Sequence, residues 1–406
     1  MINLIGISSD IGNITLNALE AIQKSDIIIN FDELDLSDLR PYIRNKKIIT
    51  TIVEEEKEDD DEVISIEIKD WDEEDSPEED LSSNEEEEES EESFDDIELK
   101  DPFYLRLKES YSKIEFAIRA SKGNQNVAII TSSNPSINGI ANLLIQMCSK
   151  YDGVEVKIYP GVSPIDYSAS VLGAPLEDFA VIDLNNPLVS DSELEAKIDY
   201  AIKNNLVLVV YNPINEFDNN NKNFNLLKDI VSEFNDELLV GIVNSNSSRV
   251  ICKFKEINEL IISENSVLII GNKLTYKIGD YMVTSSDYIV EPKFISHNID
   301  FFKRYLNGEV PRGLDMECEY LPCHKELEAC DFCYCPFYPC ADGVTGGEWI
   351  KEREIWNCTN CIWIHLDKPC ACIREEFDDM FENIEELKTK HIELLKLRRK
   401  CLLETK

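Results

Sequence analysis

The chain has 406 residues, enough for two or three domains with cores of their own, and a formal net charge of −41. A polyanion this acidic repels nucleic-acid phosphates, so nucleic-acid binding is disfavoured. The N-terminus has no basic stretch before an apolar run, and no segment is apolar for long enough to span a bilayer. We therefore expect a soluble, cytoplasmic protein with no membrane partner.

The first elements predict an alternation of strand and helix. Ile2–Ile5 and Asp26–Phe31 are short apolar runs typical of buried strands. Between them, apolar residues recur at helical spacing after Thr15, which is a good helix cap.

An acidic segment interrupts this pattern. Between Glu54 and Glu98 there are 27 acidic residues against Lys57 and Lys69. Such a segment cannot bury enough apolar surface to offset its ordering entropy, so residues 53–100 are predicted to be a disordered insert. A docking site for a basic partner is the alternative. The fold should resume near Asp101 with a helix.

Two later strands end in loops of small residues, proline and glycine, and each loop opens a helix. Val127–Thr131 leads into Ser132–Gly139, and Val154–Tyr159 leads into Pro160–Pro164. In α/β proteins such loops line ligand clefts at the carboxyl ends of strands, so we expect them to share one pocket. These strands complete an N-terminal α/β domain over residues 1–159.

A second α/β domain is predicted over residues 160–292. A capping box at Ser192–Glu195 should open a helix that runs towards Lys203. A second sheet is expected from five apolar runs, namely Phe179–Leu184, Leu206–Tyr211, Leu238–Val243, Val267–Ile270 and Tyr281–Thr284.

Four motifs of these two domains, in this order, resemble those of the tetrapyrrole methylases. They are Ile129–Gly139, Tyr159–Ser163, Leu172–Leu176 with Phe179–Ile182, and Tyr211–Pro213. Within that family they are similar to the precorrin-3B, or cobalt-factor III, C(17)-methyltransferase branch. The resemblance implies a two-domain tetrapyrrole methylase fold, S-adenosylmethionine as the cofactor, a precorrin-type substrate that is methylated at C(17) with ring contraction, and a homodimer.

The resemblance also implies site residues. By their places in the motifs, Asn134, Ile137, Ser163, Tyr211 and Pro213 are expected to bind S-adenosylmethionine. Gly6, Asp10 and Ser133 are expected to bind the tetrapyrrole, and Arg106, Arg119 and Arg249 are candidate partners for its carboxylates. No catalytic residue is assigned, because methyl transfer from a sulfonium depends mainly on positioning.

Two loops depart from the family pattern. Ser8-Ser9-Asp10 stands where the family has a Gly-Pro-Gly core, and Ser133-Asn134-Pro135 stands where it has Gly-Asp-Pro. Loss of a carboxylate is expected to weaken cofactor binding, since charge-assisted hydrogen bonds are the stronger ones. Two alternatives therefore stay open: a non-catalytic tetrapyrrole- or metal-binding interaction protein on a methylase scaffold, and a methylase that acts on another precorrin carbon.

The C-terminal part is predicted to be a cysteine-rich metal-binding module over residues 317–375, after a linker over 293–316. Ten of the 13 cysteines lie between Cys318 and Cys372, and in a reducing cytoplasm such a cluster favours metal over disulfides. Two C-x2-C knuckles are typical of tetrahedral sulfur sites, Cys330 with Cys333 and Cys358 with Cys361. A second site could draw its ligands from eight further residues, which the sequence does not assign: Cys318, Cys323, Cys335, Cys340, Cys370, Cys372, His324 and His365.

Zinc and an iron–sulfur cluster both suit thiolates, and the spacing does not separate them. The module resembles the small cysteine-rich domain attached to corrin-pathway proteins of methanogens, which favours an anaerobic route on a cobalt-containing intermediate. A single helix is predicted over residues 376–406, with an apolar stripe and basic residues near its end.

Overall fold

The structure is a computed structural model that describes residues 1–7, 11–55, 63–68, 102–137, 139–214, 221–244, 248–258, 261–263, 265–285 and 296–406. The chain divides into two compact units, Met1–Asp166 and Tyr167–Lys406. Asp10, one of the expected substrate-binding residues, lies outside the described residues, as does much of the acidic segment.

The first unit is built on a six-stranded sheet with the order β4-β3-β2-β5-β1-β6. The pairs β3–β2, β2–β5, β5–β1 and β1–β6 are parallel, whereas β4 runs antiparallel to β3. The strands are β1 (Ile2–Ile7), β2 (Ile27–Asn30), β3 (Lys47–Glu55), β4 (Val63–Ile68), β5 (Val127–Ser132) and β6 (Val156–Tyr159). Parallel strands covered on both faces are continuous apolar runs, as the sequence Ile27–Ile29 illustrates.

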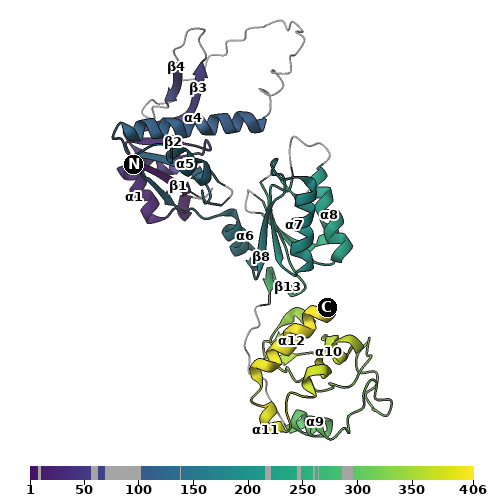
Figure 1. Ribbon diagram of the computed structural model, residues 1–406. Helices are drawn as coiled ribbons and strands as arrows, with labels where there is room; N and C mark the ends of the chain where they lie inside the picture. Colours follow the sequence, from purple (N-terminus) through teal and green to yellow (C-terminus); the bar gives the residue numbers. More distant parts are fainter. Residues whose placement is uncertain are drawn as a thin grey trace, which may run out of the picture. The chain divides into compact units, whose positions relative to one another are not determined.

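Helices cover both faces of this sheet (Figure 1). Alternate residues of β1 point to opposite sides, so Leu4 packs with α4 (Pro102–Lys122) and α5 (Ala141–Cys148). Ile5 packs on the other side with α1 (Leu16–Lys24) and α2 (Arg40–Ile43). The predicted α/β class and the helix capped by Thr15 are confirmed, since the Thr15 hydroxyl accepts a hydrogen bond from Ala18 N at 3.2 Å.

The expectation of disorder over 53–100 is corrected at two places. The end of β3, residues 53–55, pairs with β4 at residues 63–65, with Val53 opposite Ser65. The sequence Val63–Ile68 alternates β-branched with polar residues, which suits a strand. The first unit also extends to Asp166, past the predicted boundary at residue 159.

The second unit contains a five-stranded sheet with the order β11-β10-β12-β9-β8. Its strands are β8 (Phe179–Asp183), β9 (Val207–Tyr211), β10 (Leu239–Val243), β11 (Arg249–Lys253) and β12 (Val267–Ile270). The helices α7 (Asp191–Lys203) and α8 (Lys222–Asn235) pack together against it, and their apolar residues share its core (Figure 1). The helix α6 (Pro164–Leu172) begins in the first unit and ends in the second.

Two sequence predictions for this sheet are wrong. The cap of α7 is Ser190, whose hydroxyl accepts from Glu193 N at 3.3 Å, so the capping residue lies two positions before the predicted Ser192. The run Tyr281–Thr284 forms β14, which belongs to a separate three-stranded sheet with β13 (Thr275–Ile278) and β7 (Gly173–Ala174).

The cysteine-rich part of the second unit has its own apolar core. Its elements are α9 (Ser296–Leu306), β15 (Glu348–Ile350), β16 (Ile355–Asn357), α10 (Asp367–Phe377), α11 (Ile384–Leu387) and α12 (His391–Thr405). Phe302 of α9, Phe332 and Phe377 are fully buried in one cluster of tilted and edge-on rings. The core therefore joins the cysteine loops to both flanking helical regions.

Three predictions for this part are corrected. The expected linker contains α9, because Phe301, Phe302 and Tyr305 recur at helical spacing and fill the core. The single helix expected over 376–406 is divided into the end of α10, α11 and α12, and the side chain of Asn383 caps α11. Cys372 forms a disulfide with Cys401, which joins α10 to α12 and removes Cys372 from the expected metal ligands.

Candidate functional site

Three loops meet at the carboxyl edge of the first sheet, where β1 lies between β5 and β6. An added Cβ at Gly6 would stand 2.1 Å from the carbonyl oxygen of Ser133 and 2.7 Å from the amide nitrogen of Gly161. A Cβ at Gly161 would stand 2.4 Å from that same oxygen. Both positions therefore require glycine, because the Ser133 carbonyl fills the space where side chains would begin.

Ser133 itself holds a left-handed backbone, with φ of 62°. Its amide donates to the Ile7 carbonyl at 2.6 Å, which ties the β5 loop to the end of β1. A non-glycine residue pays about 1 kcal/mol or more in this conformation. The loop thus keeps the backbone form of a glycine although the sequence has serine here.

The next residues form a tight turn. Asn134 Oδ1 accepts from Ser136 N at 3.0 Å, and the Asn134 carbonyl accepts from Ile137 N at 3.0 Å. The amide side chain is therefore already engaged at its oxygen, while the Ile137 side chain is 37% exposed. Together they offer a bound molecule one amide group and one apolar surface.

A carboxylate that the sequence reasoning missed also lies at this edge. Asp32, just after β2, accepts at one oxygen from Thr131 Oγ1 at 2.6 Å, from Ser132 N at 2.7 Å and from Ser132 Oγ at 2.8 Å. The signal was available, because an acidic residue directly after a buried parallel strand lies at the ligand-binding edge of such sheets. Asp32 positions the end of β5, where the loop with Ser133 begins.

Ser163 has a structural role at the third loop. It is buried, and its hydroxyl donates a hydrogen bond to Asp166 Oδ2 at 2.6 Å. The Ser163 hydroxyl oxygen accepts a hydrogen bond from Asp166 N at 3.2 Å, which is the bond that an N-cap residue makes to the first turn of a helix, here α6. Its side chain therefore fixes the direction in which α6 leaves the sheet.

The remaining expected cofactor residues lie in the second unit, at the end of β9. Tyr211 is half-buried and Pro213 is buried. Asn212 between them has φ of 46°, and its side chain donates to Asp183 Oδ1 at 2.9 Å. The segment is thus held in a sharp bend at the carboxyl ends of the parallel strands β8 and β9.

The candidate arginines lie on two different elements, Arg106 and Arg119 on α4 and Arg249 on β11. Arg119 pairs with Glu115 on α4 at 3.0 Å, and Arg106 is exposed on the same helix. Arg249 lies in the second unit, where it donates to the Val171 carbonyl and stacks over the Tyr281 ring.

The cysteine-rich part contains a cavity of about 450 Å³ lined by thiols, imidazoles and aromatic rings. Among the described residues, no three His, Cys, Asp or Glu side chains stand close enough together to hold an ion as they are. Cys370 is buried and its thiol donates to the Ile364 carbonyl at 2.9 Å, so it is engaged elsewhere. His365 is buried and stacks on His324, with ring centroids 4.4 Å apart.

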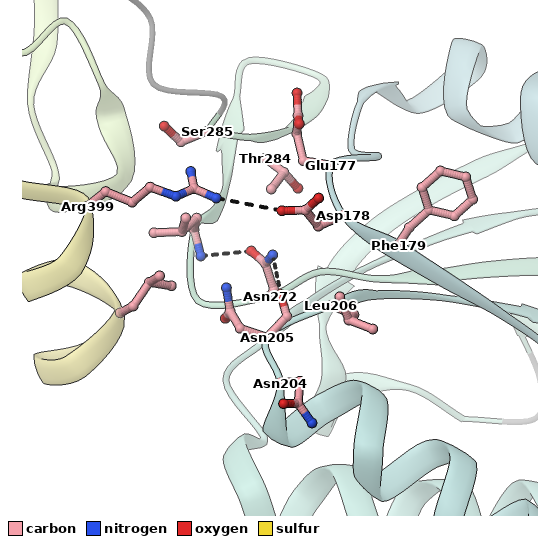
Figure 2. Close-up of a pocket in the computed structure, with 12 residues that line it drawn as sticks. Glu177, Asp178, Phe179, Asn204, Asn205, Leu206, Asn272, Thr284, Ser285 and Arg399 are labelled. Atoms are coloured by element: carbon pink, nitrogen blue, oxygen red, sulfur yellow. Dashed lines mark hydrogen bonds and ion pairs between the residues drawn. The ribbon is translucent and has the colours of Figure 1, made fainter. Parts of the chain in front are cut away.

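A second cavity, of about 340 Å³, contains none of the expected site residues (Figure 2). Asn272 and Asn205 line it and are hydrogen-bonded to each other's segments, with Asn272 Nδ2 donating to the Asn205 carbonyl at 2.9 Å. Arg399 reaches Asp178 at 3.8 Å across it. Four of its polar groups therefore already pair with one another.

Among the helices that the structure describes, none is both long and apolar enough to cross a bilayer.

Comparisons with known proteins agree with this architecture. The family described as tetrapyrrole (corrin/porphyrin) methylases matches residues 1–247, and one described as a cysteine-rich small domain matches residues 312–390. A probable cobalt-factor III C(17)-methyltransferase of Methanothermobacter thermautotrophicus is 37% identical over 295 residues, which cover 72% of this chain and 83% of that protein.

Two further proteins also match this chain. An uncharacterized protein of Methanocaldococcus jannaschii is 40% identical over 67 residues, which are 16% of this chain and 56% of that protein. The crystal structure of the methyltransferase CobJ is 16% identical with a TM-score of 0.48, and the match covers 70% of this chain and 99% of that one.

Proposed function

Because the chain belongs to the tetrapyrrole (corrin/porphyrin) methylases, as its motifs predict, we propose that it is an S-adenosylmethionine-dependent methyltransferase of cobalamin biosynthesis. Its proposed reaction is methylation at C(17) of a cobalt-factor III or cobalt-precorrin-3 type macrocycle with ring contraction. The observation that carries this proposal is the 37% identity to the probable C(17)-methyltransferase over most of both chains.

In this chemistry the main role of the protein is to position the reacting groups. S-adenosylmethionine supplies an activated methyl group, so the chain has to hold the acceptor carbon in line and keep water away. Five residues are proposed to hold the cofactor, namely Asn134, Ile137, Ser163, Tyr211 and Pro213. The exposed Ile137 side chain and the Asn134 amide suit adenosine, whereas Ser163 would act through its capping of α6.

Three residues are proposed to contact the macrocycle: Gly6, Asp10 and Ser133. The close packing of the Gly6, Ser133 and Gly161 backbones supports a role for these loops in shaping the edge where ligands bind.

The cysteine-rich domain is proposed to bind zinc or an iron–sulfur cluster. Its donor chemistry fits, because thiolates suit both. Seven cysteines remain proposed ligands after the loss of Cys372 to its disulfide and the engagement of Cys370. They are Cys323, Cys330, Cys333, Cys335, Cys340, Cys358 and Cys361.

The deciding experiment incubates the purified full chain anaerobically with S-adenosylmethionine and cobalt-factor III, or cobalt-precorrin-3, and follows the macrocycle by mass spectrometry. Gain of one methyl group in a ring-contracted product is the expected result. A methylated product without contraction, or methylation at another carbon, would support the alternative methylase. An unchanged macrocycle together with no binding of S-adenosylmethionine would support the non-catalytic scaffold.

The proposal includes a homodimer in the cytoplasm with a tetrapyrrole as the small-molecule partner and without nucleic acid. Light scattering on the purified chain tests the dimer, with about twice the 46.5 kDa chain mass expected. A mass of one chain over the working concentration range would remove the dimer from the proposal and leave the proposed activity unaffected.

A further inference from the structure

The cysteines of the C-terminal part repeat one spacing. A C-x4-C pair is followed by a C-x2-C pair, and this order occurs twice in succession. The first set is Cys318, Cys323, Cys330 and Cys333. The second set is Cys335, Cys340, Cys358 and Cys361.

The two C-x2-C pairs have the same local geometry. Cys333 N donates to the Cys330 carbonyl at 3.1 Å, and Cys361 N donates to the Cys358 carbonyl at 2.9 Å. Each pair is thus bent into a tight turn, the form in which two thiols of one short segment face the same side. Local geometry alone does not say which C-x4-C pair each turn accompanies.

The residues that line the cavity distinguish the two sets. All four residues of the second set line the cavity of about 450 Å³, whereas Cys333 is the one member of the first set among the described residues around it. Cys335, Cys340 and Cys361 also pack against the same apolar core. The second set therefore lines one cavity with residues that lie within 26 positions of one another.

A buried cation of the protein adjoins the second set. Arg398 on α12 is 4% exposed, and its Nη1 donates to Asp342 Oδ2 at 2.7 Å. Its Nη2 is buried without a hydrogen-bond partner in the described chain, although the residue lines the same cavity. Cys340 lines this cavity as well, so the guanidinium and the Cys340 thiol border the same space.

A second buried N–H group without a hydrogen-bond acceptor lies near the second set in the sequence. The indole Nε1 of Trp356 is buried and has no hydrogen bond of normal geometry within the described residues. This indole belongs to the residue two positions before Cys358 in the chain. A buried N–H without an acceptor is unfavourable, and a thiolate sulfur is an acceptor that suits both the indole and the guanidinium.

We propose that the second set forms one four-thiolate metal site, that Arg398 donates a hydrogen bond to its sulfurs, and that the first set forms a separate site. This rests on the metal proposed above. It replaces the pairing expected from sequence, in which the Cys330 turn and the Cys358 turn share one ion. Binding would draw the sulfurs together, since no three described groups converge as they stand.

The test is metal content per chain in anaerobically purified full-length protein loaded with Zn²⁺ alone, with iron measured in the same samples. Cys335→Ser and Cys358→Ser are each expected to lose one site, and the double variant to lose no more than either. Combining Cys330→Ser with Cys358→Ser is expected to lose a second site. The proposal is overturned if that pair loses only one site while Cys335→Ser loses none. Metal-free wild-type protein would instead refute metal binding by the domain, whatever the methyltransferase assay shows.

A second measurement avoids variants that fail to fold. Wild-type protein is treated with rising chelator, alkylated, digested and read by peptide mass spectrometry. The four thiols of the second set should become reactive together and separately from those of the first set. Simultaneous release of the Cys330 and Cys358 turns, ahead of Cys335, would contradict the assignment.

Arg398 is tested against its neighbour on the same helix. Arg398→Gln should weaken Co²⁺ affinity about 10–100-fold and shift the thiolate-to-cobalt absorption band, as loss of an outer hydrogen bond does. Arg399→Gln is the matched control, because Arg399 pairs with Asp178 and does not line this cavity. Equal cobalt affinity in the two variants would remove Arg398 from the site.

Discussion

Replacing Gly6 by alanine probes the packing of the three loops most directly. The new Cβ would stand 2.1 Å from the Ser133 carbonyl oxygen, whereas a comfortable contact is about 3.3 Å. The β5 loop would therefore have to move by about 1 Å, and the Gly161 amide, 2.7 Å from the same Cβ, blocks one direction of escape.

The cost can be worked from the contacts. Overpacking of this kind costs about 1–3 kcal/mol, and weakening the bond from Ser133 N to the Ile7 carbonyl adds about 1 kcal/mol. A loss of about 2–4 kcal/mol in a unit of this size lowers its transition temperature by about 5–15 °C. Gly153→Ala is the control, because no atom lies within 4 Å of its Cβ position and only its left-handed backbone, φ 78°, is disfavoured.

Hydrogen exchange of the β1 and β5 amides, measured together with a thermal melt, reports the stability of the first unit separately from that of the second. We expect faster exchange in both strands and weaker binding of S-adenosylmethionine for Gly6→Ala, with a much smaller change for Gly153→Ala. Equal melting shifts in the two variants, with cofactor affinity retained in both, would refute the account of the loop packing.

Three further changes have defined outcomes. Ser133→Gly should stabilise the first unit by about 0.5–1 kcal/mol in urea unfolding, because glycine tolerates φ of 62°. Ser136→Gly is the control and should not stabilise the unit. A loss of stability in Ser133→Gly would count against backbone strain at this position. Ser163→Ala should cost about 1 kcal/mol through loss of the α6 cap and Ser163→Thr much less, so equal losses would argue against capping. Burial, aided by the charge of His324, lowers the pKa of His365 from 6.5 to about 4. Because the unfolded chain takes up that proton at higher pH, the free energy of unfolding should fall as pH drops from about 6.5 towards 4, by about 3 kcal/mol at most. His365→Gln should flatten this dependence in thermal melts across that pH range. An unchanged pH dependence in the variant would contradict the prediction.

The parallel sheet of the first unit was predictable because its information is local. Ile27–Ile29 and Val127–Ile130 are apolar without alternation, and the loops after β5 and β6 carry family motifs within a few residues. Helix boundaries were less certain where caps compete. Ser190 and Ser192 both precede a glutamate by three positions, and only the packed position of α7 selects Ser190.

Sequence by itself determined the family, the strand–loop–helix order and the presence of a cysteine-rich domain. Those depend on short patterns in which each residue's chemistry and its close neighbours suffice. Tertiary structure alone decided that Ser133 places its carbonyl between Gly6 and Gly161, that Cys372 meets Cys401, and that Arg398 lines the same cavity as Cys340. These pairings join residues far apart along the chain, so they depend on how sheets and helices pack, which no local pattern encodes.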